Sequence, residues 1–166
     1  MRNVLILCTA NSARSILAEA ILAKLGEGRF SALSAGSKPR GVPNPLALEL
    51  LAAKGHDISR LRSKSWEEFA QESSPPIHCV ITVCDNAAGE TCPIWPGAPV
   101  QVHWGIPDPA GESDDGALAS FEIAYCRLTD RFNAMLALDE EALTPREWRD
   151  ALMQIGRDAE GSTAHG

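Results

Sequence analysis

The chain has 166 residues, 45% of them hydrophobic and 22% charged, which is typical of one globular domain and excludes fibrous and intrinsically disordered classes. Its formal net charge of −7, without any block of Lys and Arg, argues against nucleic acid and anionic membranes as partners. The cysteines number five and no apolar run approaches the roughly 20 residues of a membrane span. We therefore expect reduced thiols in a cytoplasmic protein without a secretory signal.

Short apolar runs alternate with segments of helical periodicity along the chain. The predicted strands are 4–7, 30–34, 79–83 and 100–103, and the predicted helical segments are 15–25, 45–53, 66–71, 117–138 and 144–157. This alternation predicts an α/β fold with a doubly wound, mainly four-stranded parallel sheet that helices cover on both faces. We expect one domain over residues 1–158, a flexible tail over 159–166, and a monomer.

Three helix boundaries carry recognisable signals. Asn44 precedes Pro45 and is expected to cap the second helix, which Gly55 ends. Thr144 and Glu147 have the spacing of a capping box at the start of the last helix.

A cysteine lies where the first predicted strand turns into the first helix. Five residues separate Cys8 from Arg14, and a loop of this length can surround a tetrahedral oxyanion with inward-pointing backbone N–H groups. The helix N-terminus and the guanidinium add positive charge, which favours the nucleophilic thiolate, and Ser15 can donate a hydrogen bond to the sulfur. The alternative is a buried strand-end cysteine beside a surface arginine. The other loop residues expected to bind the oxyanion are Thr9, Ala10, Asn11, Ser12 and Ala13.

Two further cysteines follow the third predicted strand. Cys84 stands at the strand end, and Cys92 lies in a loop rich in Gly, Pro and Ala over residues 86–99. One thiol could attack a sulfur adduct on Cys8, and the other could resolve the disulfide and carry it to the surface. The alternatives are structural cysteines and a zinc site. Its ligands would be Cys79, Cys84, Cys92 and His103, but without a C-x2-C pair we predict no metal.

The segment after the fourth predicted strand reads His103-Trp104-Gly105-Ile106-Pro107-Asp108-Pro109. Two prolines hold Asp108 between them. A carboxyl group that faces the oxyanion can protonate a leaving oxygen as a general acid. The alternative is an aspartate that only stabilises a turn.

These three motifs together resemble the arsenate reductases built on the low-molecular-weight tyrosine phosphatase fold. The resemblance implies that Cys8 attacks arsenate while Asp108 protonates the departing oxygen. It further implies that Cys84 attacks the arsenic-bearing Cys8 and releases arsenite, and that Cys92 then takes over the disulfide. Related enzymes with three such cysteines use thioredoxin as the reductant, and glutaredoxin with glutathione stays open as an alternative. No cofactor is implied.

The resemblance also bears on cations. Some relatives bind potassium through an asparagine and a glutamate that match Asn11 and Glu19, and through an aspartate where this chain has Lys64. We expect the Lys64 ammonium to take the place of the cation and to pair with Glu19, so that activity does not depend on potassium.

Two other functions compete with the reductase. A tyrosine phosphatase would use Cys8, Arg14 and Asp108 without a redox step, but Pro109 is followed by Ala110 and not by an aromatic residue that could hold a phosphotyrosine ring. A non-enzymatic module that binds oxyanions and senses redox state would need neither a nucleophile nor a proton donor. We therefore predict an arsenate reductase with weak phosphatase activity.

Overall fold

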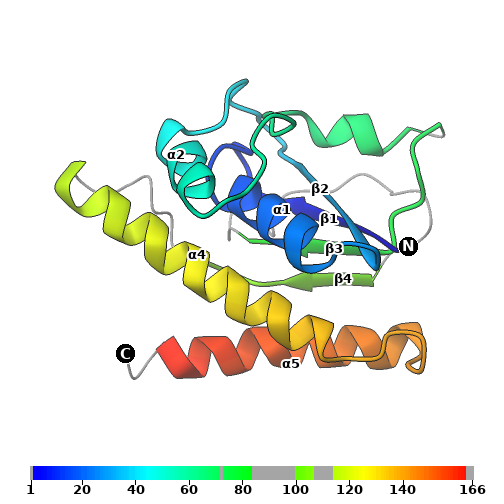
Figure 1. Ribbon diagram of the computed structural model, residues 1–166. Helices are drawn as coiled ribbons and strands as arrows, with labels where there is room; N and C mark the ends of the chain where they lie inside the picture. The colour runs from blue at the N-terminus through cyan, green and yellow to red at the C-terminus, as the bar shows by residue number, and fades with distance from the viewer. Residues whose placement is uncertain (1, 72, 84–99, 107–113, 164–166) are drawn as a thin grey trace.

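The computed structural model describes residues 2–71, 73–83, 100–106 and 114–163, with side chains throughout except at 114–118 and 158–163 (Figure 1). Four parallel strands form one sheet in the order β2-β1-β3-β4. They are β1 (Arg2–Leu7), β2 (Phe30–Ala35), β3 (Cys79–Thr82) and β4 (Val100–His103). The predicted four-stranded parallel sheet is confirmed. Strand β2 is added on one side of β1, and β3 is added on its other side. The strand order therefore reverses between β1 and β3, and ligands bind at such a point in parallel sheets.

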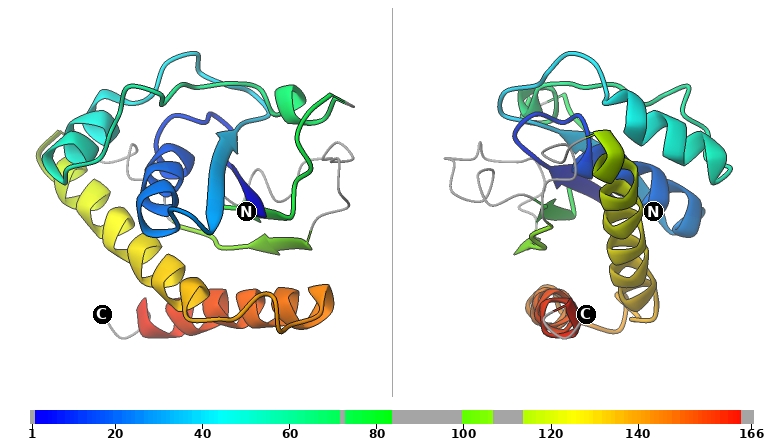
Figure 2. Two further views of the ribbon diagram at one scale, coloured as in Figure 1. Left: turned by 45° about the vertical axis from the view of Figure 1, so that its right-hand side comes forward. Right: turned by 90° about the vertical axis from the view of Figure 1, so that its left-hand side faces the viewer.

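Helices cover the sheet unequally. They are α1 (Arg14–Leu25), α2 (Pro45–Ala53), α4 (Asp114–Leu136), α5 (Pro145–Thr163) and a short 3-10 helix, η1 (Trp66–Phe69). Helices α1, α2 and α4 lie on the same side of the sheet in the right-hand view of Figure 2. Val4 and Ile6 of β1 point into their core, whereas Leu5 and Leu7 pack with Phe69 of η1 on the other face. These four side chains are fully buried, which is why residues 4–7 form an uninterrupted apolar run.

The expected helix boundaries are confirmed where a capping residue marks them. The Asn44 side chain accepts a hydrogen bond from Leu46 N–H at 2.9 Å. Thr144 and Glu147 form the reciprocal bonds of a capping box, at 2.9 and 3.1 Å. Gly55 follows the last turn of α2 with φ of +86°, a conformation that glycine adopts without strain.

Most predicted elements differ from the observed ones by three residues or fewer at each end, and the main differences occur at two places. The helical segment expected over 66–71 is the single 3-10 turn Trp66–Phe69, too short to show a helical period. Helix α5 continues to Thr163, past the expected end at residue 157 and into the segment expected to be a tail, because Asp158, Ala159 and Glu160 do not interrupt a helix. No helix in the described part of the chain is both long enough and apolar enough to cross a membrane.

Candidate active site

Cys8 lies directly after β1, at the carboxyl edge of the sheet and beside the reversal of strand order. Its side chain is buried, with 4% of the residue's surface exposed. Its backbone N–H donates to Ala35 O at 3.2 Å, so the end of β2 holds the start of the loop. The loop then runs through residue 13 into α1, as the sequence predicts.

Hydrogen bonds from a neighbouring segment of the chain fix the backbone of this loop. Three of its carbonyl groups accept backbone N–H bonds from the surrounding segment 38–44. The bonds are Lys38 to Thr9 (3.0 Å), Arg40 to Ala10 (2.9 Å) and Asn44 to Ser12 (2.8 Å). In a trans peptide the N–H points away from the carbonyl of the same unit, so the amides of residues 10, 11 and 13 point to the opposite side. Successive N–H groups turned to one side form the concave nest that binds anions.

Helix α1 begins at this nest without a side-chain cap. Its N-cap residue, Ala13, has φ of −122° and ψ of −80° and no capping side-chain hydrogen bond, and the first turn carries no acidic residue. The first N–H groups of an α-helix have no partner inside the helix and carry its positive dipole end. The local electrostatics therefore favour an anion beside Cys8.

Arg14 is held by the segment that follows β4. Its Nη1 donates to Ile106 O at 2.9 Å. Ile106 is buried and in turn donates its N–H to Val83 O at 3.0 Å, so the carbonyl that orients Arg14 belongs to an ordered extension of β4. A guanidinium has five N–H donors, and this contact therefore sets its position without using its whole binding capacity.

Asn11 locks the shape of the loop from inside. It adopts a left-handed conformation with φ of 47°, which asparagine tolerates better than most residues, and it is completely buried. Its Nδ2 donates to Ser15 Oγ at 2.8 Å and to Ser34 Oγ at 3.0 Å, while its Oδ1 accepts the N–H of Lys64 at 2.9 Å. These three bonds connect the loop to α1, to β2 and to the segment at residue 64.

Lys64 is buried next to the same network. Only 8% of it is exposed, and its Nζ lies 3.5 Å from Glu19 Oε1 and donates to Arg62 O at 2.9 Å. Burial lowers the pKa of Lys64, and the negative charge of Glu19 opposes that shift. Ser34 Oγ donates to Glu19, which joins the ion pair to Asn11. The predicted pairing of Lys64 with Glu19 is confirmed.

Gly36 is a further residue on which the loop depends, and sequence reasoning missed it. A Cβ atom built at this position would lie 2.4 Å from Thr9 O and 2.6 Å from Cys8 O. The end of β2 therefore approaches the loop backbone at a distance that only glycine permits. The available signal was a glycine directly after an apolar strand.

The sequence of this fold matches a known family. The model of the family described as low molecular weight phosphotyrosine protein phosphatase matches residues 3–144. The chain belongs to this family.

Among members of the phosphatase family, the chain is similar to bacterial arsenate reductases. It is 34% identical to arsenate reductase 2 of Staphylococcus epidermidis over 111 residues, which cover 67% of this chain and 81% of that protein. It is 38% identical to an arsenate reductase of Halalkalibacterium halodurans over 104 residues, covering 63% and 71%.

The fold is also similar to solved structures of arsenate reductases. An arsenate reductase in the phosphate binding state matches with a TM-score of 0.66 and 27% identity, covering 82% of this chain and 98% of that one. A thioredoxin-dependent arsenate reductase of Corynebacterium glutamicum matches with a TM-score of 0.59 and 26% identity, covering 83% and 64%.

Three of the predicted site residues, Cys84, Cys92 and Asp108, lie outside the described residues, as does the loop over 86–99. The residue that precedes each gap lies at the site: Val83 N–H donates to Leu7 O at 2.9 Å, and Ile106 O accepts from Arg14 Nη1. Of the proposed zinc ligands, Cys79 is fully buried in β3, and burial raises the pKa of its thiol. Within the described ranges no group of three or more His, Cys, Asp or Glu side chains could hold a metal ion.

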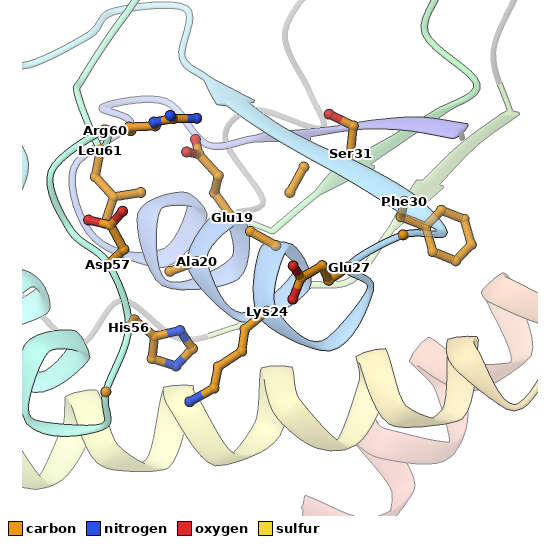
Figure 3. Close-up of a pocket in the computed structure, with 14 residues that line it drawn as sticks. Glu19, Ala20, Lys24, Glu27, Phe30, Ser31, His56, Asp57, Arg60 and Leu61 are labelled. Atoms are coloured by element: carbon orange, nitrogen blue, oxygen red, sulfur yellow. The ribbon is translucent and has the colours of Figure 1, made fainter.

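A separate cavity is bordered by α1, β2 and the loop after α2 (Figure 3). Its volume is about 610 Å³, and Glu19 lines it together with Lys24, Asp57 and Arg60. The residues of the loop between β1 and α1 are not among those that line it. Glu19 therefore pairs with Lys64 and also lines a cavity that is separate from the loop.

Proposed function

We propose that this protein is an arsenate reductase that converts arsenate to arsenite by nucleophilic attack of Cys8 and a relay of disulfides. The observation that carries the proposal is the loop between β1 and α1, whose outward-bonded carbonyls turn several amides to one side next to the buried Cys8. The names of the similar reductases support arsenate as the substrate.

In the first step, the loop amides and Arg14 bind the arsenate oxygens. The Cys8 thiolate attacks arsenic, a sulfur–arsenic bond forms, and one oxygen leaves as water after it accepts a proton from Asp108. Because Ser15 Oγ accepts a hydrogen bond from Asn11, its own hydroxyl hydrogen must point elsewhere. We assign that hydrogen to the Cys8 sulfur, where it stabilises the thiolate.

In the second step, the Cys84 thiolate attacks the sulfur of Cys8. The sulfur–arsenic bond breaks and leaves its electron pair on arsenic, so arsenic is reduced from +5 to +3 and leaves as arsenite, while two thiols become one disulfide. The position of Val83 beside Leu7 supports this assignment, because the next residue of each strand carries one of the two thiols.

In the third step, Cys92 attacks Cys84, which releases Cys8 as a thiolate and leaves a disulfide between Cys84 and Cys92. We propose thioredoxin as its reductant, which agrees with the thioredoxin-dependent neighbour, and glutaredoxin with glutathione is the alternative. We propose the cytoplasm as the compartment, because thioredoxin and glutathione keep thiols reduced there. All roles fall on one chain, so the proposal needs only a monomer.

A single-turnover experiment tests the chemistry without any reductase partner. The fully reduced protein is mixed with arsenate, and arsenite and free thiols are then counted. The proposal expects up to one arsenite and the loss of two thiols per protein molecule. A phosphatase or a binding module would produce no arsenite. The Cys84→Ser variant is the matched control, because it retains Cys8 but cannot release arsenite by forming the first disulfide.

A further inference from the structure

Helix α5 begins where the family match ends. The match stops at residue 144, and α5 covers Pro145–Thr163. The helix runs beside β4 and the end of α4 in Figures 1 and 2. The match to the phosphatase family therefore does not extend over this helix.

The side chain of Trp104 contacts the backbone of α5. Trp104, which follows β4, is fully buried, and its indole Nε1–H donates to Leu152 O at 2.9 Å. A Cβ atom built at Gly156 would lie 2.8 Å from Cδ1 of the same ring. The absence of a side chain at Gly156 therefore lets the indole reach the helix backbone. Phe132 of α4 packs edge-on against the ring, with centroids 5.5 Å apart, and fixes it from the other side.

The backbone after Trp104 leads directly to the oxyanion loop. Trp104 N–H donates to Thr82 O at 2.7 Å, so the segment stays in register with β3. Two residues later, Ile106 O accepts the bond from Arg14 Nη1 at 2.9 Å. Between them, Gly105 O accepts from Arg131 Nη1 at 3.2 Å. A displacement of the indole would therefore be transmitted through two residues to the carbonyl that orients the guanidinium.

We infer that α5 is a positioning element of the active site: Gly156 and Leu152 hold Trp104, and the backbone of residues 104–106 thereby places Arg14 for oxyanion binding. The inference rests on the proposed role of Arg14. A planar guanidinium binds two oxyanion oxygens only in a narrow range of orientations, so small shifts of Ile106 O weaken binding.

The test uses the affinity of the full-length reduced protein for inorganic phosphate, measured by isothermal titration calorimetry. Gly156→Ala is the first variant. Alanine raises helix propensity, so α5 itself is not weakened, but the added methyl group displaces the indole. We expect the dissociation constant of the folded protein for phosphate to rise about tenfold, and the displaced indole to lower the melting temperature as well. Trp104→Phe, which removes the N–H donor to Leu152, is the second variant and is expected to act in the same direction.

Trp148→Phe is the matched control. Like Trp104→Phe, it removes an indole, but this indole belongs to α5 itself. Trp148 stacks on Phe30 with ring centroids 6.3 Å apart, and its Nε1 has no hydrogen-bond partner among the described atoms. It lies off the route to Ile106 and should leave phosphate affinity unchanged. A purely structural role of α5 would lower the melting temperature of the variants but not the affinity of the folded fraction.

Arg14→Ala separates the two claims. If the wild type binds phosphate and Arg14→Ala does not, the role of Arg14 stands. In that case, unchanged phosphate affinity in folded Gly156→Ala and Trp104→Phe overturns only the inference about α5. If Arg14→Ala binds phosphate as the wild type does, the proposed role of Arg14 fails and the inference fails with it.

Discussion

The Nζ atom of Lys64 lies 3.5 Å from Oε1 of Glu19, and both side chains are largely shielded from solvent, with 7% and 14% of their surfaces exposed. The pair connects through Ser34 to Asn11 and so to the oxyanion loop. The Lys64 ammonium is thus a positive charge of the chain itself, placed next to the hydrogen-bond network of the loop.

The first prediction concerns cation dependence. Because the Lys64 ammonium already neutralises Glu19, arsenate reduction should proceed at the same rate in potassium chloride and in sodium chloride of equal ionic strength. Steady-state rates in the two salts provide the measurement. A rate several times higher in potassium would mean that the Lys64 ammonium does not replace the ion.

The second prediction concerns Ser15. Ser15→Ala removes the hydroxyl that we assign to the Cys8 thiolate, so alkylation of Cys8 by iodoacetamide near neutral pH should become about tenfold slower, and the pH profile of alkylation should shift upward. Ser34→Ala is the control, since Ser34 also accepts a hydrogen bond from Asn11 but is not assigned to the sulfur. Equal effects of the two variants would assign Ser15 only to the shape of the loop.

The third prediction concerns Gly36. A methyl group at this position would overlap the carbonyl oxygens of Thr9 and Cys8, and backbone atoms cannot move aside as a flexible side chain can. Gly36→Ala should lower arsenate reduction about 100-fold. Gly41→Ala strains a left-handed backbone with φ of +95° but meets no atom within 4 Å, and it should retain most of the activity. Comparable losses in both variants would point to strain in the surrounding chain rather than to a clash with the loop.

The fourth prediction concerns stability in acid. Glu140 is buried, and a hydrogen bond from Arg29 lowers its pKa below the ordinary 4.5. The folded state thus binds the Glu140 proton less readily than the unfolded chain does. The stabilisation from this pair is complete above pH 4.5 and is lost as the pH falls through the lowered pKa.

Urea unfolding at a series of pH values measures that loss. Glu140→Gln should be less stable than the wild type near neutral pH, and the difference should shrink as the solution becomes more acidic. The exposed neighbour Glu141 gives the control variant Glu141→Gln. A difference between wild type and Glu140→Gln that stays constant with pH would contradict the ionic origin of the stabilisation.

The sequence was sufficient for the features that local pattern determines. The buried apolar run of β1, the spacing from Cys8 to Arg14 and the capping residues Asn44 and Thr144 are each read within a few residues, and the structure agrees with them. The pairing of Lys64 with Glu19 followed from the resemblance to a family, because the two residues are 45 positions apart and no local signal joins them.

The remaining features depend on contacts between distant parts of the chain. Arg14 and Ile106 are 92 positions apart, and the contact uses a backbone carbonyl, which every residue has and no motif marks. The same holds for the segment 38–44, whose N–H groups turn the loop carbonyls outward. The end of α5 was misjudged because the residues after 157 neither favour nor prevent a helix strongly.

The measurement that tests the central claim most directly is NADPH oxidation by the purified protein with thioredoxin, thioredoxin reductase and arsenate, alongside hydrolysis of p-nitrophenyl phosphate by the same preparation. The account predicts arsenate-dependent oxidation of NADPH that disappears in Cys84→Ser, while weak hydrolysis persists in that variant because Cys8 and Arg14 are intact. Absence of NADPH oxidation together with vigorous hydrolysis would contradict the account and identify the protein as a phosphatase.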